Sequence, residues 1–460
     1  MLEWILTPQR IVAAASLAGA YGALCAGIAF KLRQARLAQL REQQDLQGPD
    51  GEEAVLLVYA SQTGHAEMLA RRTAHALHGG GCAVRLMPVQ QLQARDLERS
   101  RHSLWLVSTT GEGDAPDHAL PFVRKLLGRK ADLARHSSLL LALGDHSYAQ
   151  FCAFGQRVQQ WLEAQAAQVE RISMHSFDAE VWGRWQQRVQ QLAHALGRED
   201  ELQWQQAAAF SPWVLRRREL LNPGSQGEPV HLLELEPQGG NLPEWRSGDL
   251  VELKAPADPG RPREYSIASI PAQGCVQLLV RQSVRADGSP GIASGWLCTG
   301  MAEGGSVALR LRAHRGFRLE DNAERPLVLI GNGTGLAGLL GHIRARIHQG
   351  RSDQWLLVGE RSSSHDAFCD AELQQWLRDG QLARLDRAWS RDGQAARYVQ
   401  HILAEQAARL RQWVEQGAAI YVCGSLQGMA QGVDDALHAV LGAQQVEQLV
   451  HSGRYRRDVY

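Results

Sequence analysis

Short apolar runs alternate with helical patterns through the first half of the chain. Strand-like runs cover AVLLVYA (54–60), SLWLVST (103–109) and SLLLALG (138–144), and a helical pattern covers 65–78. Continuous apolar runs that are bounded by helices are typical of parallel strands buried on both faces. The pattern predicts an α/β domain with a doubly wound sheet over residues 54–197.

The pattern changes after a polar stretch at 198–210, which we interpret as a linker. Closely spaced segments then alternate with period two: VHLLELE, GDLVELK, REYSIASI, CVQLLVRQSV and SVALRLR. Such strands predict a small antiparallel β-barrel over 211–322. From Pro326 the runs PLVLIGNGTG, QWLLVGE and AAIYVCG restore the alternation of strands and helices. They predict a second α/β domain over 323–460.

An uncharged run of about twenty residues, IVAAASLAGAYGALCAGIAF, covers 11–30. This length suits a membrane-spanning helix. Four basic residues follow within 31–41, which places the remaining chain on the cytoplasmic side. The sequence therefore predicts a single-pass anchor over 1–31, a stalk over 32–53 and a location at the inner membrane. A cleaved signal peptide and a buried helix are the alternatives.

Charge and cysteine content exclude several classes of function. The 49 basic and 49 acidic residues balance, so nothing indicates a nucleic-acid surface. The seven cysteines form no C-x-x-C pair, which argues against an iron–sulfur cluster or structural zinc and favours a reducing compartment. We expect no metal site.

The loops after the three strands of the first domain suit a phosphate and a flat ring. Hydroxyl residues and glycine at a strand-to-helix turn offer N–H groups to a phosphate, although ordinary helix capping uses the same residues. Loops at the carboxyl ends of parallel strands converge where ligands bind. The candidate residues are Ser61, Gln62, Thr63, Gly64, His65, Thr109, Thr110, Gly111, Glu112, Gly113, Leu143, Gly144, Asp145 and Tyr148.

The predicted barrel contains an arginine, a tyrosine and a serine in the run Arg263-Glu264-Tyr265-Ser266. Arg263 and Tyr265 lie on one face of a strand, where the guanidinium can bind a diphosphate and the phenol can stack on a ring. Ser266 can hydrogen-bond the edge of that ring. A helix start that can face the same diphosphate follows at Gly291, Ile292, Ala293 and Ser294.

The last domain carries a glycine-rich turn, Gly331-Asn332-Gly333-Thr334-Gly335, between a strand and a helix. Glycines let the backbone approach a pyrophosphate. Hydroxyl and guanidinium groups that suit the 2′-phosphate of NADPH follow, where an NAD site would show an acidic residue. The candidates are Arg361, Ser390 and Arg391, together with Arg397, Tyr398 and Gln400, which we expect on the following helix.

These motifs resemble the diflavin reductases over 54–460, and among them the flavoprotein subunit of bacterial sulfite reductase. The resemblance implies a flavodoxin-like FMN domain followed by a ferredoxin-reductase-like module that binds FAD and NADPH. It implies that residues 61–65 hold the FMN phosphate, that 109–113 follow the ring, and that Tyr148 stacks on it. It also places Ser266, Cys423 and Asp458 beside the path of the hydride, with Tyr460 stacked on FAD.

The sequence departs from that family pattern at three places. Thr110 stands where an aromatic residue is common, and Gly338 stands where proline is usual. A helical connecting domain normally interrupts the barrel before the Arg-x-Tyr-Ser strand, but here about ten residues separate Leu253 from Arg263. The relative orientation of the flavin domains therefore does not follow from the resemblance.

The expected reaction passes electrons from NADPH to FAD, then to FMN, then to a separate acceptor. A sirohaem sulfite reductase is the first candidate acceptor. A membrane haem protein or ferric iron and its chelates, reduced by an anchored enzyme, is the second. A non-catalytic anchored scaffold with decayed flavin sites is the third alternative.

Overall fold

The structure is a computed structural model that describes residues 54–460 except 112, 147–148, 176–177, 206–207, 286 and 394–396. The predicted anchor and stalk therefore lie outside the described residues, as do Glu112 and Tyr148 of the predicted FMN site.

The first sheet is parallel, with the strand order β2-β1-β3-β4-β5. Alternate residues of β1 face opposite sides: Val55 and Leu57 pack on α2 and α6, while Leu56 and Val58 pack with α3, α4 and α5. Both faces are buried, as the apolar runs predicted. The strands are β1 Val55–Ala60, β2 Val84–Pro88, β3 His102–Ser108, β4 Ser137–Gly144 and β5 Gln168–His175. The helices are α2 His65–Gly79, α3 Ala94–Glu98, α4 Leu120–Lys125, α5 Ala153–Ala164 and α6 Ala179–Ala195.

The second sheet is antiparallel, with the order β10-β7-β6-β11-β8-β9. It curls on itself, because Ala268 N, just after β9, donates to Gln277 O of β10 at 2.8 Å. Strands β8 and β9 form a direct hairpin that ends at the pair Ala255 and Asp258, so no domain is inserted between them. The strands are β6 Ser211–Leu220, β7 Val230–Pro237, β8 Leu250–Ala255, β9 Asp258–Ser266, β10 Val276–Arg281 and β11 Ser306–Arg312, with helix α7 Ile292–Gly295 between the last two.

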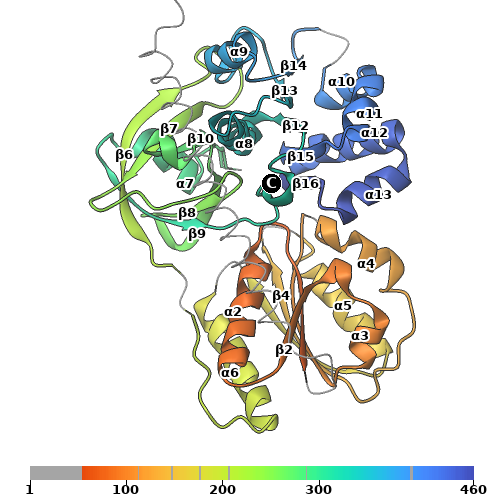
Figure 1. Cartoon of the computed structure of the whole chain (residues 1–460). Helices are drawn as coiled ribbons and strands as arrows, with labels where there is room; N and C mark the ends of the chain where they lie inside the picture. Colours follow the sequence, from red (N-terminus) through yellow and green to blue (C-terminus); the bar gives the residue numbers. More distant parts are fainter. Residues whose placement is uncertain are drawn as a thin grey trace, which may run out of the picture.

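The third sheet is parallel, with the order β14-β13-β12-β15-β16. Helices α8 and α9 pack on one face, and α10 to α13 cover the other (Figure 1). Its strands are β12 Leu327–Asn332, β13 Gln354–Glu360, β14 Arg384–Trp389, β15 Ala419–Gly424 and β16 Tyr455–Val459. Its helices are α8 Leu336–His348, α9 Asp370–Arg378, α10 Val399–Glu405, α11 Ala407–Glu415, α12 Gln431–Leu441 and α13 Ala443–His451.

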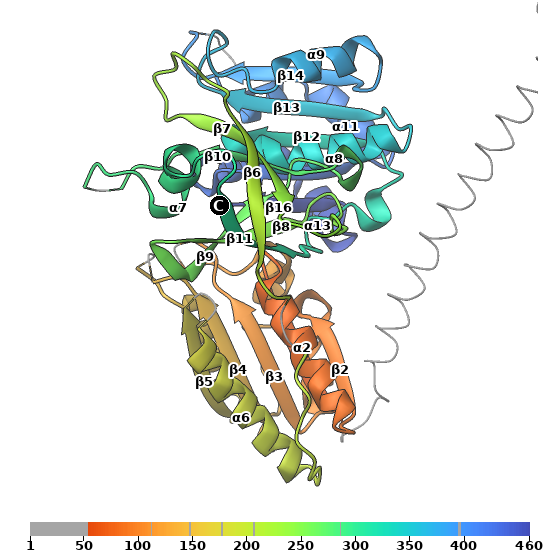
Figure 2. The same cartoon turned by 90° about the vertical axis from the view of Figure 1, so that its left-hand side faces the viewer.

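The first sheet with its helices lies below the other two sheets, and the C-terminus lies at the junction (Figures 1 and 2). Polar contacts cross this junction from the loops at the carboxyl ends of the first sheet. Arg312 Nη1 donates to Thr63 O at 2.8 Å, Arg261 Nη2 lies 3.2 Å from Asp145 Oδ1, and Arg457 Nε donates to Asp117 Oδ2 at 2.6 Å. The predicted ligand loops therefore face the rest of the molecule.

The predicted location at the inner membrane requires a correction. In the part of the chain that the structure describes, no helix is both long enough and apolar enough to cross a bilayer. The longest of these helices, α6, has 17 residues and buries only one face, whereas a span needs about 20 apolar residues. This finding contradicts the predicted localisation.

Candidate active site

The loop after β1 leads directly into helix α2 through Gly64, whose φ of 81° favours glycine. Ser61 Oγ accepts from Ala66 N at 3.1 Å and so caps the helix start. The first N–H groups of a helix have no partner within the helix and suit an anion. Burial and the charges of Arg312 and Arg310 lower the pKa of His65 to about 3, so this imidazole is neutral. A phosphate held here would rely on N–H groups rather than on His65.

The loop after β3 provides the matching wall. Gly111 and Gly113 have φ of 50° and 115°, and a Cβ on Gly111 would lie 2.9 Å from Leu426 Cδ2. Thr110 Oγ1 is buried without a hydrogen-bond partner among the described residues. Thr109 N donates to Leu143 O at 2.8 Å, which ties this loop to the end of β4. The two glycines leave space for a flat ring, and the unpaired hydroxyl of Thr110 can form a hydrogen bond with a polar edge of that ring. Beside them, Gly144 ends β4 and Asp145 contacts Arg261.

Two residues that the sequence did not single out complete this loop cluster. Ser61 N donates to His118 Nε2 at 3.3 Å, and Gln62 Nε2 donates to Asp117 Oδ2 at 2.8 Å. Burial lowers the pKa of His118 to about 4, so its neutral ring can accept that bond. Asp117 and His118 begin a short helical turn after the second loop, and their residue types carry no motif that could have identified them.

The predicted FAD motif lies on β9. Arg263 Nη2 donates to Asp258 Oδ2 at 3.1 Å, and Tyr265 packs beside the core of the antiparallel sheet. Near the start of α7, Ser294 Oγ and Ser283 Oγ are 2.7 Å apart. A Cβ on Gly291 would lie 2.1 Å from Ser283 Oγ, so a larger residue here would displace the hydroxyls of this turn. Ile292 and Ala293 follow it as the first residues of α7.

Three predicted residues from distant parts of the chain meet behind the glycine-rich turn. Ser266 Oγ donates to Asp458 Oδ2 at 2.9 Å, and Cys423 Sγ lies 3.8 Å from the same oxygen. Burial and the negative charge of Asp458 raise the pKa of the Cys423 thiol well above its ordinary value, so it stays protonated. A Cβ on Gly338 would lie 3.2 Å from Cys423 Sγ, so glycine at this position leaves more room for the thiol than the usual proline would.

The C-terminal Tyr460 is held rather than frayed. Its backbone N donates to Gly424 O at 3.0 Å, and its hydroxyl lies 3.3 Å from Thr334 Oγ1. The side chain is nevertheless 57 % exposed. Tyr460 also interacts electrostatically with Cys423 and Asp458, so its exposed ring lies near them, where another ring can pack against it.

The glycine-rich turn after β12 is tightly enclosed. A Cβ on Gly331 or Gly335 would lie 2.6 or 2.2 Å from Cys423 O. Gly333 has φ of 56°, and a Cβ there would lie 2.7 Å from the Arg281 guanidinium. Arg281, at the end of β10, was not identified from the sequence, because its strand was interpreted only as part of the barrel. It adds a cation to a turn that suits a pyrophosphate.

Three of the residues predicted for the 2′-phosphate, Arg361, Ser390 and Arg391, lie together just after β13 and β14. Ser390 N donates to Glu360 O at 2.9 Å, and Arg391 N donates to Arg361 O at 2.8 Å, which brings the two arginines together. One detail is corrected: α10 begins at Val399, so the exposed residues Arg397 and Tyr398 precede that helix, because Tyr398 has the extended backbone of its N-cap. Gln400 lies on α10, packed against Gly432.

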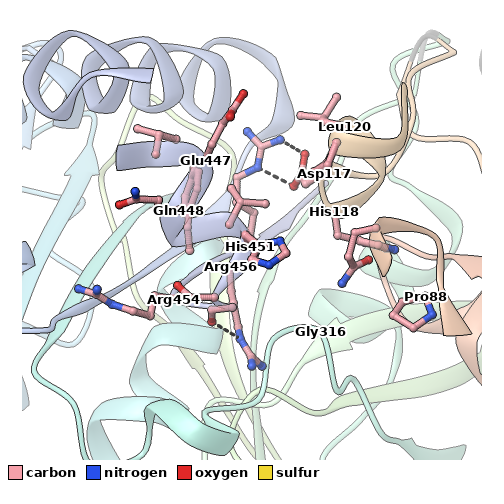
Figure 3. A pocket seen from close by; sticks show the side chains of 18 of the residues that line it. Pro88, Asp117, His118, Leu120, Gly316, Glu447, Gln448, His451, Arg454 and Arg456 are labelled. Atoms are coloured by element: carbon pink, nitrogen blue, oxygen red, sulfur yellow. Dashed lines mark hydrogen bonds and ion pairs between the residues drawn. The ribbon is translucent and has the colours of Figure 1, made fainter. Parts of the chain in front are cut away.

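A cleft of about 1140 Å³ separates the first sheet's loops from α13 and β16 (Figure 3). Asp117, His118 and Leu120 line one side, while His451 and Arg456 line the other. The ion pair between Asp117 and Arg457 crosses it.

Comparison with known proteins agrees with this architecture. Residues 57–213 match the flavodoxin family, and residues 329–435 match the oxidoreductase NAD-binding domain family. Similar proteins include the sulfite reductase (NADPH) flavoprotein alpha-components of Vibrio cholerae serotype O1, Shewanella sp. strain MR-7 and Yersinia enterocolitica. The first is 26 % identical over 534 residues, covering 88 % of this chain and 87 % of the relative. The second is 27 % identical, covering 92 % of both chains, and the third is 27 % identical, covering 88 % of this chain and 90 % of the relative.

A flavodoxin domain and an oxidoreductase NAD-binding domain thus occur in one chain, with an antiparallel sheet between them. The comparisons confirm the predicted enzyme class and function: the chain is a flavin-dependent oxidoreductase of the diflavin reductase type.

Proposed function

We propose that the chain binds FMN at the carboxyl end of the first sheet, FAD against β9 and α7, and NADPH at the glycine-rich turn after β12. The relatives named as NADPH flavoprotein components support this set of cofactors. The proposed domains are 54–197 for FMN, 211–322 for FAD and 323–460 for the nucleotide, with a linker at 198–210. The convergence of Ser266, Cys423 and Asp458 behind Tyr460 is the observation that carries the proposal.

When bound, the two flavins supply the conversion of a two-electron hydride donor into single electrons. The residues of the chain position the reacting groups. Asp458 accepts from Ser266 and so fixes the direction of that hydroxyl, while the protonated Cys423 thiol lies beside the same carboxylate without adding charge. Tyr460 covers the entrance and must move when the nicotinamide enters.

Arg361, Ser390 and Arg391 are proposed to bind the 2′-phosphate. Guanidinium groups bind phosphate oxygens through paired hydrogen bonds, and neighbouring arginines on two strand ends suit that geometry. Arg397 and Tyr398 precede α10 and Gln400 lies on it, and we propose that they add to this site. We propose Arg281 at Gly333 for the pyrophosphate.

The acceptor is proposed to be a separate protein. The relatives are named as one component of sulfite reductase, which favours a haemoprotein component of that enzyme as the partner. The direct hairpin between β8 and β9 supports the absence of a connecting domain from this chain. The aligned span of 534 residues is longer than the chain itself, in agreement with residues in the relatives that this chain lacks.

The test uses the purified full chain. We expect one FAD and one FMN per chain after extraction and chromatography, and reduction of ferricyanide with NADPH much faster than with NADH. A preparation that binds neither flavin under reconstitution would refute the proposal. Equal rates with the two nucleotides would remove only the role given to Arg361, Ser390 and Arg391.

A further inference from the structure

His314 lies just after β11 and is fully buried. Its backbone N donates to Asp249 Oδ1 at 3.0 Å, and Arg318 holds that carboxylate through bonds of 2.6 and 2.8 Å. The main chain at His314 is therefore fixed. The position of its ring follows from this anchor rather than from a flexible loop.

The ring of His314 lies between the two proposed flavin sites. On one side, Nε2 is 3.5 Å from Asp458 Oδ1, while the other oxygen of Asp458 accepts from Ser266. On the other side, a Cβ on Gly64 would lie 3.5 Å from His314 Nδ1 and from Ala313 O. The ring thus contacts both the carboxylate beside the proposed hydride path and the proposed FMN phosphate loop.

Neighbouring residues make the same connection. Arg312 donates to Thr63 O at 2.8 Å and to Glu264 Oε2 at 2.6 Å. Among the described residues, neither ring nitrogen of His314 has a hydrogen bond of ordinary length, although the ring is fully enclosed. A buried imidazole without such bonds costs free energy, so ordinary hydrogen bonding does not explain why a histidine occupies this position.

We infer that His314 is a positioning residue shared by the two flavin sites, directing the Asp458 carboxylate toward Ser266 when the FMN phosphate loop is docked against the ring. The inference rests on the proposed function. Docking of the first sheet excludes water from His314, which strengthens its interaction with Asp458. Oxidation of NADPH at the FAD site therefore depends on the position of the FMN domain.

The electrostatic surroundings agree with this role. Burial would raise the pKa of Asp458, but the contact with His314, the hydrogen bond from Ser266 and the charge of Arg312 outweigh burial and lower it. The other titratable groups that interact with this carboxylate include Cys423 on β15, Glu264 on β9, His342 on α8 and the C-terminal Tyr460. The net result keeps Asp458 ionised as an acceptor for Ser266.

Two amide substitutions separate the two ring nitrogens. The amide nitrogen of glutamine can occupy the place of Nε2, whereas that of asparagine reaches only the place of Nδ1. In the full chain, we expect His314→Gln to reduce flavin with NADPH within about 2-fold of the wild-type rate. We expect His314→Asn to slow it about 10-fold at pH 7 and to move the acid limb of the pH profile up by about one unit. Stopped-flow absorbance after pH jumps to values between about pH 3.5 and 8 measures both effects, because the pKa of Asp458 lies below its ordinary value.

A second readout does not depend on activity. Hydrogen–deuterium exchange in residues 61–66 of the full chain reports how firmly the phosphate loop is held. We expect His314→Ala to increase this exchange, because it opens a space beside Gly64. His342→Ala is the matched control: the buried rings of His314 and His342 both pack on Phe317, at centroid distances of 6.0 and 5.0 Å. It should leave exchange in 61–66 unchanged.

The outcomes are distinct. Equal rates and equal acid limbs in His314→Gln and His314→Asn would overturn the positioning role, since the ring would then only fill space. Unchanged exchange in His314→Ala would overturn the link to the FMN loop. If the wild-type chain binds flavins but does not oxidise NADPH, the proposed function fails instead, whatever the His314 variants show.

Discussion

The ion pair between Arg457 and Asp117 joins β16 to the first sheet's loops at the junction. Arg457 Nε donates to Asp117 Oδ2 at 2.6 Å, and a second guanidinium nitrogen contacts the other carboxylate oxygen. We predict that Asp117→Ala weakens the docking of the first sheet on the reductase module. The substitution also removes the bond from Gln62, so FMN content must be measured for each variant.

The expected size follows from the burial of the pair. The Arg457 and Asp117 side chains are 15 % and 26 % exposed, so the pair lies between a surface pair worth about 0–1 kcal/mol and a buried pair whose disruption costs about 3–5 kcal/mol. We therefore expect a loss of about 1–2 kcal/mol. This corresponds to a roughly 5- to 30-fold shift from the docked to the separated arrangement.

Small-angle X-ray scattering of the full chain at increasing salt measures that shift. Salt screens partly exposed charges, so the radius of gyration should rise at lower salt in Asp117→Ala than in the wild type. Glu447→Ala is the matched control, because its pair with Arg124 also crosses the junction but has side chains that are 51 % and 56 % exposed. Little change is expected from this control. If Asp117→Ala and Glu447→Ala gave the same salt response, the reasoning from burial would be refuted.

Three further predictions test separate parts of the molecule. Ser266→Ala removes the donor to Asp458, and flavin reduction by NADPH should slow by about 10- to 100-fold in stopped-flow measurements; an unchanged rate would exclude Ser266 from the reaction. Arg391→Gln should raise the KM for NADPH roughly 10-fold and leave the KM for NADH unchanged, and equal effects on both would contradict binding of the 2′-phosphate. Burial and the charge of Arg456 lower the pKa of His342 to about 3. The unfolded chain therefore binds a proton that the folded protein excludes, and the stability of the fold decreases as the pH drops below about 6.5. His342→Leu should remove about 2 kcal/mol of that loss between pH 6.5 and 5, measured by urea unfolding at both pH values, and an unchanged pH dependence would contradict it.

The sequence predicted the central strands of the parallel sheets and missed their edges. Strands β1, β3 and β12 are buried on both faces, so their apolar runs are continuous. The edge strands β5 and β14 are half-exposed, and in their sequences, QVERISMH and RLDRAW, polar residues interrupt the apolar pattern. Hydrophobic periodicity cannot distinguish such a strand from a loop.

The candidate site was predictable where a motif lies in one loop. The turns at 61–65 and 331–335 follow strands, and the topology of parallel sheets brings such turns to one edge. Asp117, Arg281 and His314 were not predictable in the same way. Their roles depend on contacts with residues 52 or more positions away, and their residue types are common on any surface.

The arrangement of the two flavin sites has a consequence for delivery of electrons. The loops proposed to hold FMN face the reductase module, where Thr63, Asp145 and Asp117 make polar contacts with it. A separate acceptor protein needs access to the same edge of the first sheet, so the docked arrangement favours transfer between flavins and blocks transfer outward. With a two-residue turn between β8 and β9, polar contacts such as these help to hold the docked state. Because such contacts are individually worth only a few kcal/mol, separation remains thermally accessible, and the polypeptide around 198–210 can then act as the tether for outward transfer.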